Sequence, residues 1–328
     1  MGEYEILDRC PSQILEEIPD DAIILTDEHV TLQWSHALSG RPQIVLPAGE
    51  ASKSLATFGE CLEKMAGLGA SRRTHLVAVG GGVIGDLGGF LAATYMRGIP
   101  FIQVPTTLLA MVDSSVGGKV GIDLAAGKNL AGAFWPPAKV ILVEETLSTL
   151  PPRQWTNGMA EVWKYGFIMD LELLELLQSP WEKTAIIQRC IRLKQQVVEA
   201  DEFETLGIRA SLNFGHTIGH AIERITGYGP ILHGEAIAIG MVAEATLGER
   251  IGFTEPGTAD QIRTFLAKEG LPTWSPILRE ADWLLDAMKT DKKATKGSLA
   301  FSLLPQLGHC KLVKDVDIAA IREVLEAA

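Results

Sequence analysis

Short apolar runs alternate with helical stretches through the first 150 residues, and this alternation constrains the fold more than any other feature of the chain. The apolar runs have no alternating polar positions, which is typical of strands buried on both faces of a sheet. They occupy residues 22–27, 43–47, 74–82, 99–107 and 138–144, with helical stretches at 54–69 and 85–98. Strands that alternate with helices predict a mostly parallel sheet and a Rossmann-like α/β fold.

The pattern changes at Pro151 and Pro152, after which helical periodicity dominates. Asp317 is the expected N-cap of the last helix. One strand pair is predicted at 298–313. The predicted helices cover residues 171–178, 186–202, 212–223, 234–252, 258–270 and 318–328. We therefore predict two domains, an α/β domain over residues 1–150 and a mainly helical domain over residues 151–328.

The composition restricts the partners of this chain. The 41 acidic residues outnumber the 29 basic ones, for a net charge of -12, which argues against nucleic acid or an anionic membrane as partner. No stretch of about 20 apolar residues and no leader pattern is found, so we expect a cytoplasmic protein. The cysteines lack CxxC spacing, which favours neither a disulfide framework nor a thiolate metal site.

Glycines follow the third predicted strand with the spacing GxGxxG, at Gly80, Gly82 and Gly85. Glycine lets the backbone approach a pyrophosphate closely, and the following helix offers unpaired N–H groups. Asp86 in that first turn would repel a phosphate. It is therefore either an acid that stabilises the helix terminus or an acceptor for a ribose or nicotinamide group.

Two further segments contain candidate ligand-binding groups. Thr106 and Thr107 end the next predicted strand, where open α/β sheets bind ligands. Residues 113–129 are rich in glycine and hydroxyl groups, and Lys119 and Lys128 each follow a glycine. In an acidic protein this predicts a loop that binds phosphate or carboxylate, with a solvated surface loop as the alternative.

Three histidines and one acid are candidate metal ligands. His216 and His220 are four residues apart in a predicted helix, close enough to share a zinc ion. His233 begins another predicted helix, and Glu161 lies among apolar neighbours. A catalytic zinc normally takes three protein ligands and keeps one open position, so four candidates are one too many, and spacing leaves the choice open.

Taken together, these motifs resemble the 3-dehydroquinate synthase family of sugar phosphate cyclases. The resemblance extends from about residue 27 to residue 293. It is carried by GGGVIGDLGGF, TYMRGIPFIQVPTTLLAMVDSSVGGK, GKNLAGAF, LPPRQWTNGMAEVWKYG, LNFGHTIGHAIE, HGEAIAIGM and DKK. Matches in this order along nearly the whole chain are specific to the family.

The resemblance implies an enzyme of the shikimate pathway of aromatic amino acid biosynthesis. This lyase would convert 3-deoxy-D-arabino-heptulosonate 7-phosphate into 3-dehydroquinate and phosphate. The implied reaction is a transient oxidation by NAD, elimination of phosphate, re-reduction and an internal aldol closure. The implied cofactors are NAD and a zinc or cobalt ion, and the implied assembly is a homodimer.

The resemblance also implies a role for individual residues. Glu161, His216 and His233 match the metal ligands, and His220 matches a catalytic histidine that faces the substrate. The residues that match the nucleotide contacts are Asp27, Glu50, Lys53, Gly81, Gly82, Val83, Asp86, Thr106, Thr107, Asp113, Ser114, Lys128, Thr149 and Leu150. Those that match the substrate contacts and remaining catalytic groups are Arg97, Lys119, Asn129, Lys164, Lys194, Arg209, Asn213 and one of Lys292 and Lys293.

Three other functions are compatible with parts of this pattern. Other sugar phosphate cyclases share the cofactors, but SSVGGK, Asn129 and the pair Arg209 and Asn213 favour the dehydroquinate branch. Alcohol dehydrogenases of the glycerol dehydrogenase type share the architecture but would accumulate NADH. A non-catalytic nucleotide-binding or scaffold protein would have no need of the intact metal set.

Overall fold

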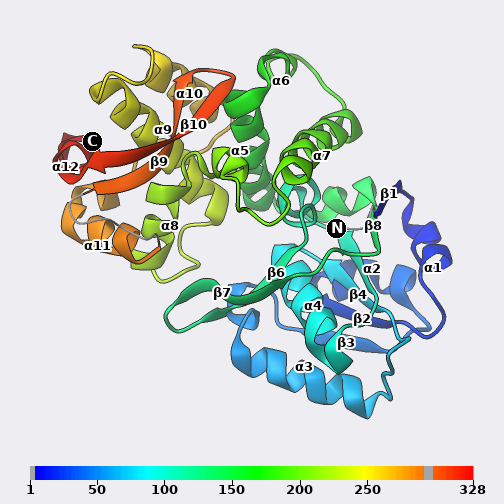
Figure 1. Cartoon of the computed structure of the whole chain (residues 1–328). Helices are drawn as coiled ribbons and strands as arrows, with labels where there is room; N and C mark the ends of the chain where they lie inside the picture. Colours follow the sequence, from blue (N-terminus) through cyan, green and yellow to red (C-terminus); the bar gives the residue numbers. More distant parts are fainter. Residues whose placement is uncertain (1–3, 292–297, 328) are drawn as a thin grey trace. The chain divides into compact units, whose positions relative to one another are not determined.

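The computed structural model of the chain describes residues 4–291 and 298–327. Lys292 and Lys293, one of which is expected to contact substrate, lie outside the described residues. The chain divides into two compact units, residues 1–155 and 156–328 (Figure 1). This division lies close to the boundary predicted from Pro151 and Pro152.

The first unit is built on a six-stranded sheet in which all neighbouring strands are parallel. The strand order is β1-β8-β5-β4-β2-β3. The five predicted strands are confirmed, whereas the edge strand β1 was not predicted. The bounds are β1 Glu5–Asp8, β2 Ile23–Asp27, β3 Gln43–Leu46, β4 Leu76–Gly80, β5 Phe101–Pro105 and β8 Lys139–Leu142. The chain adds β3 on one side of β2, and it adds β5 and then β8 on the opposite side of β4. The topological switch point therefore lies between β2 and β4.

Helices cover both faces of this sheet. Leu25 and Ala78 pack with α3 (Leu55–Gly67) and α4 (Gly82–Thr94) on one face. Alternate strand residues, such as Ile24, pack on the other face with the segment that contains α1 (Ile14–Glu17) and α2 (Glu28–Trp34). Burial on two faces explains why the strands are continuously apolar.

The segment predicted as a basic loop over residues 113–129 is largely a β-hairpin, and the loop prediction is wrong from Lys119 onward. The strands β6 (Lys119–Leu124) and β7 (Gly127–Phe134) pair antiparallel. Gly121 faces Gly132 across the hairpin, and a Cβ on either would lie 2.7 or 2.3 Å from a carbonyl oxygen of the opposite strand. The glycines that suggested a loop therefore permit close pairing of two strands.

The second unit is mainly helical, and each helix predicted for it is present, although short breaks divide some of the predicted ranges. The bounds are α5 Pro152–Met169, α6 Leu171–Leu176, α7 Lys183–Ala200, α8 His216–Ile225, α9 His233–Arg250, α10 Thr258–Lys268, α11 Ala281–Asp291 and α12 Ile318–Ala327. The helices α8, α9, α11 and α12 pack into one core with the strand β9 (Ser298–Gln306). Across residues 4–291 and 298–327, no helix combines the length and apolar character needed to cross a membrane.

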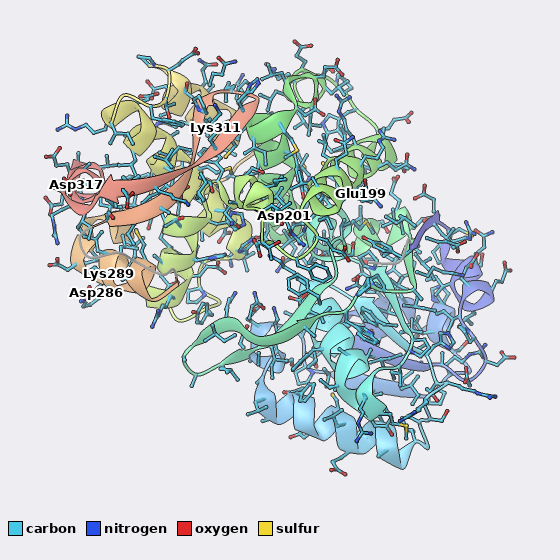
Figure 2. All side chains as sticks on the ribbon, in the orientation of Figure 1. Glu199, Asp201, Asp286, Lys289, Lys311 and Asp317 are labelled. Atoms are coloured by element: carbon cyan, nitrogen blue, oxygen red, sulfur yellow. The ribbon has the colours of Figure 1, made fainter. Side chains whose placement is uncertain are left out.

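The predicted strand pair and the predicted cap of the last helix are both confirmed. The strand β9 pairs antiparallel with β10 (His309–Asp317). Asp317 directly precedes α12 (Figure 2), and its Oδ1 accepts a hydrogen bond from the backbone N–H of Ala319 at 3.0 Å. This bond satisfies one of the first four amides of the helix.

Two glycines in helices of the first unit should respond oppositely to a methyl group. A Cβ on Gly89 would lie 2.2 Å from Cγ1 of Val120, whereas a Cβ on Gly59 meets no atom within 4 Å. We expect Gly89→Ala to lower the free energy of unfolding by about 1–3 kcal/mol through overpacking, and Gly59→Ala to raise it by up to about 1 kcal/mol through helix propensity. Urea denaturation of both variants checks this. Equal effects would contradict the close packing of α4 on β6.

Candidate metal centre and nucleotide-binding turn

The nucleotide candidates lie at or after the carboxyl ends of the parallel strands. Asp27 ends β2, and Glu50 follows β3. Gly81 follows β4, Thr106 follows β5, and Thr149 lies beyond β8. Because parallel strands share one carboxyl edge, these residues belong to the same edge of the sheet, beside the switch point where α/β sheets bind ligands.

The glycine turn allows α4 to begin immediately after β4. Gly81 is the N-cap of α4, and Gly82 is its first residue. A Cβ on Gly81 would lie 3.1 Å from Cγ2 of Thr107, and a Cβ on Gly82 would lie 3.2 Å from Oγ of Ser114. The backbone amides of this first turn are available to an anion, since an α-helix leaves its first N–H groups without intrahelical partners.

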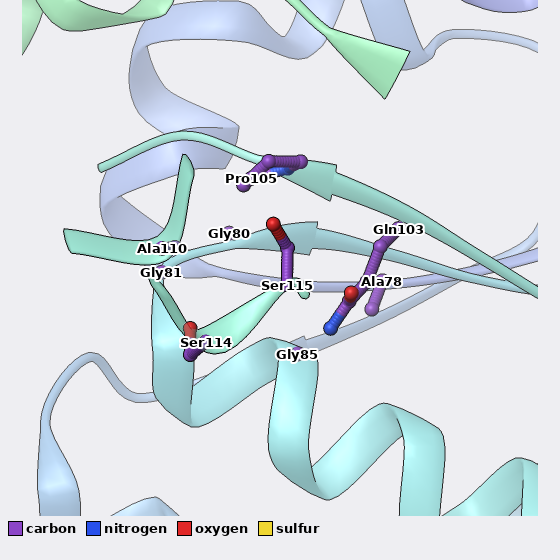
Figure 3. A pocket seen from close by; sticks show the side chains of 9 residues that line it. All are labelled: Ala78, Gly80, Gly81, Gly85, Gln103, Pro105, Ala110, Ser114 and Ser115. Carbon is purple, nitrogen blue, oxygen red and sulfur yellow. The ribbon is translucent and has the colours of Figure 1, made fainter. Parts of the chain in front are cut away.

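Two polar residues beneath the turn were missed by the sequence reasoning. Gln103 lies on β5 and reaches toward Gly85 of α4 (Figure 3), where a Cβ would come within 2.6 Å of its Nε2 atom. Ser115 is buried, and its Oγ has no hydrogen-bond partner among the described residues. Gln103 and Ser115 line the same pocket (Figure 3). A glutamine inside an otherwise apolar strand was the sequence signal for these buried polar groups.

Lys53 joins three elements of the first unit. Its ammonium is buried and lies 2.6 Å from Oδ2 of Asp86 on α4 and 2.5 Å from Oδ1 of Asn129 on β7. Burial alone would lower the pKa of Lys53, but Asp86 and Glu50 raise it. Asp86 is therefore the counter-charge of a buried lysine. Because α4 begins at Gly82, Asp86 lies beyond the first turn, where the sequence had placed it.

Asp123, which was not predicted, holds Asn129 in place. Its Oδ1 accepts a hydrogen bond from the backbone N–H of Asn129 at 2.9 Å. Asn129 has a left-handed backbone with φ of 54°, a conformation that asparagine tolerates better than most residues. Burial raises the pKa of Asp123 to about 6. Lys128, the neighbouring residue, pairs with Glu50 at 3.1 Å.

The substrate candidates of the first unit are not gathered in one place. Lys119 is the first residue of β6, whereas Asn129 lies near the turn of the hairpin. Arg97 is exposed, and it precedes the amino end of β5. The helix α4 runs from the carboxyl end of β4 back to the amino end of β5. Arg97 therefore lies at the amino ends of the strands, whereas Gly81 and Thr106 lie at the carboxyl ends.

Three helices of the second unit each bring one candidate metal ligand to a common point. Glu161 is on α5, His216 is the first residue of α8, and His233 is the first residue of α9. The Nε2 atoms of both histidines lie 3.5 Å from Oε1 of Glu161. One ligand atom from each residue lies within 4.8 Å of the other two, so a single cation could be held by all three.

The hydrogen bonds of these residues fit a metal site. The Nδ1 atom of His216 lies 3.1 Å from the carbonyl oxygen of Phe214, and Nδ1 of His233 lies 3.1 Å from Oε2 of Glu223. These contacts orient both Nε2 atoms toward Glu161, as outer carboxylates and carbonyls do in zinc proteins. Glu161 is wholly buried, and its Oε1 accepts no hydrogen bond within the described part of the chain.

Glu161, His216 and His233 have shifted pKa values because they are buried close to one another and to other charged groups. Burial would raise the pKa of Glu161, but Lys164 and His233 hold it at about 2. Burial lowers the pKa of His216 well below its usual value, and Lys164 adds to this effect. Burial opposes protonation of His233 too, yet Glu223 and Glu161 raise its pKa to about 10. The carboxylate of Glu161 and the neutral imidazole of His216 are thus in the state that binds a metal, whereas His233 would release a proton on binding.

His220 lies beside the centre. Its ring centroid is 5.2 Å from that of His216 and 6.0 Å from that of His233. It forms a second candidate group with Glu223 and His233, but it is not part of the group that contains Glu161. The sequence spacing made His216 and His220 equal candidates for a metal ligand. In the structure only His216 belongs to the group that contains Glu161.

Cations predicted to meet the substrate are buried in the same unit. Lys164, Lys194 and Arg209 are each nine-tenths buried or more, and Lys164 pairs with Glu161. Arg209 is positioned by Asp201 (Figure 2), whose carboxylate accepts hydrogen bonds from four backbone amides, among them that of Arg209 at 3.3 Å. Asp201 was not predicted as a functional residue.

Asn157 connects the helix of Glu161 to the helix of His233. Its Oδ1 accepts a hydrogen bond from the backbone N–H of Gly234 at 2.6 Å. A Cβ on Gly234 would lie 2.0 Å from the carbonyl oxygen of Asn157. Only glycine permits this approach, so Gly234 allows α5 and α9 to pack closely where they carry the candidate ligands Glu161 and His233.

Two family models match the chain. The model described as 3-dehydroquinate synthase N-terminal matches residues 43–157, and the model described as 3-dehydroquinate synthase C-terminal matches residues 158–294. A 3-dehydroquinate synthase from Synechococcus sp. is 46% identical over 295 residues, which are 87% of this chain and 80% of the relative.

Solved structures share the fold. A 2-deoxy-scyllo-inosose synthase in complex with carbaglucose-6-phosphate, NAD+ and Co2+ has a TM-score of 0.84 and 29% identity, and covers 99% of this chain and 96% of that chain. A 2-epi-5-epi-valiolone synthase from Streptomyces hygroscopicus with NAD+ and Zn2+ has a TM-score of 0.89 and 24% identity, and covers 100% of this chain and 97% of that chain. The second likeness shows the fold alone.

The geometry distinguishes the three candidate metal ligands Glu161, His216 and His233 from the neighbouring His220. We expect Glu161→Gln and His216→Ala to lose zinc, since each removes one of three ligands. His220→Ala should keep about one zinc per chain, because His220 lies outside that group. Elemental analysis of the purified variants after dialysis checks this. Loss of zinc from His220→Ala would instead make His220 a ligand.

Proposed function

The chain belongs to the 3-dehydroquinate synthase family, and from this premise we propose which of its residues carry the reaction. The activity is the conversion of 3-deoxy-D-arabino-heptulosonate 7-phosphate into 3-dehydroquinate and phosphate, a step of the shikimate pathway. It depends on NAD and a divalent metal ion. The observation that carries our assignment is the convergence of Oε1 of Glu161 with Nε2 of His216 and Nε2 of His233.

In our proposal residues 1–150 bind the nucleotide and residues 151–328 bind the metal. When bound, NAD accepts and returns a hydride, and the metal polarises the hydroxyl group that is oxidised. Glu161, His216 and His233 hold the cation. Zinc and cobalt both suit one carboxylate and two imidazoles.

The nucleotide set surrounds the glycine turn. The amides of Gly81, Gly82 and Val83 would bind the pyrophosphate, since they belong to the first turn of α4. The hydroxyl groups that follow β5 and β8 would accept or donate hydrogen bonds to the sugars. The proposed set is completed by Asp27, Glu50, Lys53, Asp86, Thr106, Thr107, Asp113, Ser114, Lys128, Thr149 and Leu150. Its support is the shared carboxyl edge of the sheet.

The substrate brings a carboxylate and a phosphate, which together carry more than two negative charges at neutral pH. Lys164, Lys194 and Arg209 would neutralise them, and their burial strengthens each charge–charge interaction. Asn213, Lys119 and Asn129 would add hydrogen bonds. Arg97 is also proposed to bind substrate, on the family resemblance alone, because its position at the amino edge of the strands gives this role no further support.

His220 and Lys164 are proposed to move and hold protons near the reacting hydroxyl group. His220 is adjacent to His216 and does not belong to the group that contains Glu161, and an imidazole can donate and accept a proton near neutral pH. Lys164 pairs with Glu161, and its charge would stabilise an oxygen that becomes anionic. The phosphate of the substrate can serve as the base for its own elimination.

We further propose that the enzyme is a cytoplasmic homodimer. Its support is the family resemblance and the chemistry, since NAD and phosphorylated sugars are metabolites of the cytoplasm. The alternative function is that of a metal-dependent dehydrogenase, which the shared fold alone would allow.

The products of one assay separate these functions. With the heptulosonate phosphate, NAD and zinc, we expect phosphate release equal to carbocycle formation, with no net rise in absorbance at 340 nm. NADH is consumed in the same cycle that forms it, so it does not accumulate. A stoichiometric rise at 340 nm without phosphate would show a dehydrogenase.

Replacement of Lys53 should weaken nucleotide binding without affecting the metal. Lys53→Met removes the ammonium that joins Asp86 and Asn129, so we expect NAD affinity to fall about tenfold, the loss of roughly one charged hydrogen bond. Zinc content should stay unchanged because its ligands belong to the other unit. Calorimetric titration with NAD checks this. The control is Lys64→Met on the exposed surface of α3, and equal affinities in both variants would contradict the role of Lys53.

A further inference from the structure

The helix α8 begins with a residue that cannot cap it. Gly215 is the N-cap, and its φ of 81° lies in the left-handed region that favours glycine. A Cβ at this position would lie 2.5 Å from Cγ of Met241 and 2.9 Å from the carbonyl oxygen of Ile237, both on α9. Close packing of the two helices therefore excludes the serine, threonine or aspartate that usually caps a helix.

The missing cap is supplied by another helix. Glu244 on α9 is wholly buried. Its Oε2 accepts a hydrogen bond from the backbone N–H of Gly215 at 2.8 Å, and its Oε1 accepts one from that of Ile218 at 3.0 Å. These are the N-cap and N3 amides, the same two that a capping box satisfies within one chain segment. A single carboxylate thus performs both functions of a capping box, and its charge suits the positive end of the helix.

This cap encloses the metal ligand of α8. His216 is the first helical residue, and it lies between the two amides that Glu244 binds. The backbone at this point is also held by Gly240, where a Cβ would lie 2.0 Å from the carbonyl oxygen of Gly215. The direction of the His216 side chain therefore depends on a carboxylate that is not one of the three candidate metal ligands.

We infer that Glu244 is a positioning residue of the metal centre, an inference that rests on the proposed metal-binding role of His216. It fixes the first turn of α8 so that Nε2 of His216 points at Oε1 of Glu161. Loss of this cap releases the turn, and one of three ligands is then held less well. Outer residues that orient metal ligands typically contribute a factor of about 10–100 to metal affinity.

The same helix provides a matched control. Glu249 on α9 accepts a hydrogen bond from the backbone N–H of Ala259 at 2.8 Å, and thereby caps α10. The N-cap of α10 is also a glycine, Gly257, with φ of 89°. Both glutamates thus cap a neighbouring helix that begins at a glycine, but α10 carries none of the three metal ligands.

The experiment compares wild type, Glu244→Gln and Glu249→Gln in metal-free form. An amide keeps one acceptor oxygen but turns an N–H donor toward the second backbone N–H, so Glu244→Gln breaks one of its two capping bonds. Glu249→Gln can keep its one bond to Ala259 and controls for the loss of a glutamate charge on the same helix. Zinc affinity is measured by competition with a chromophoric chelator, and the visible absorption of the Co2+ form reports the coordination geometry. Circular dichroism establishes that each variant is folded.

We expect zinc affinity to fall about 10–100-fold in Glu244→Gln, with a changed cobalt spectrum, and to stay at the wild-type value in Glu249→Gln. Equal affinity and an unchanged spectrum in Glu244→Gln would overturn the inference. If Glu244→Gln does not fold, Glu244→Asp, which keeps the charge but withdraws the oxygens, is subject to the same two criteria. Absence of zinc binding by the wild type would instead contradict the proposed metal centre.

Discussion

The burial of one carboxylate is the constraint on which the second unit depends. Glu161 has no exposed surface, and a charge removed from water is strongly unfavourable unless positive groups surround it. Lys164 on α5 and His233 on α9 supply these groups, and the neutral imidazole of His216 on α8 lies 3.5 Å from Oε1 of Glu161. A metal cation at the same point would complete the compensation, because Oε1 of Glu161 accepts no hydrogen bond from the described residues.

Close helix packing is what brings these groups together. Backbone contacts at Gly215, Gly234 and Gly240 leave no room for a side chain. Both helix starts accept a cap from another helix, from Asn157 at Gly234 and from Glu244 at Gly215. The start of α9 also has a local cap, because Oε2 of Glu235 accepts a hydrogen bond from the backbone N–H of Leu232. Two of the three candidate metal ligands are the first residues of their helices. The contacts that cap these helices therefore also position the candidate ligands.

Glycines also permit close packing in the first unit, where they place a helix beside the carboxyl ends of the strands. Its parallel strands gather loop residues at one carboxyl edge, and glycines let α4 start close to β4. Lys53 then connects the segment after β3 with α4 and the hairpin strand β7. A buried lysine with two partners from distant segments holds the residues around the glycine turn in a fixed arrangement, which favours binding of a ligand without large rearrangement.

Local periodicity and residue chemistry were enough to predict five strands of the parallel sheet, the glycine turn and four candidate metal ligands. Only the folded structure shows that residues 119–134 form a hairpin and that Glu161 groups with His216 and His233 and not with His220. It also supplies the hydrogen bonds from which positioning roles of Asp123, Asp201 and Glu244 are inferred. Each of these depends on contacts between residues far apart in the chain. Hydrogen bonds such as that from Gly215 to Glu244 leave no periodic signal in a single sequence. The sequence of α9 does not show which of its acidic residues faces the start of α8.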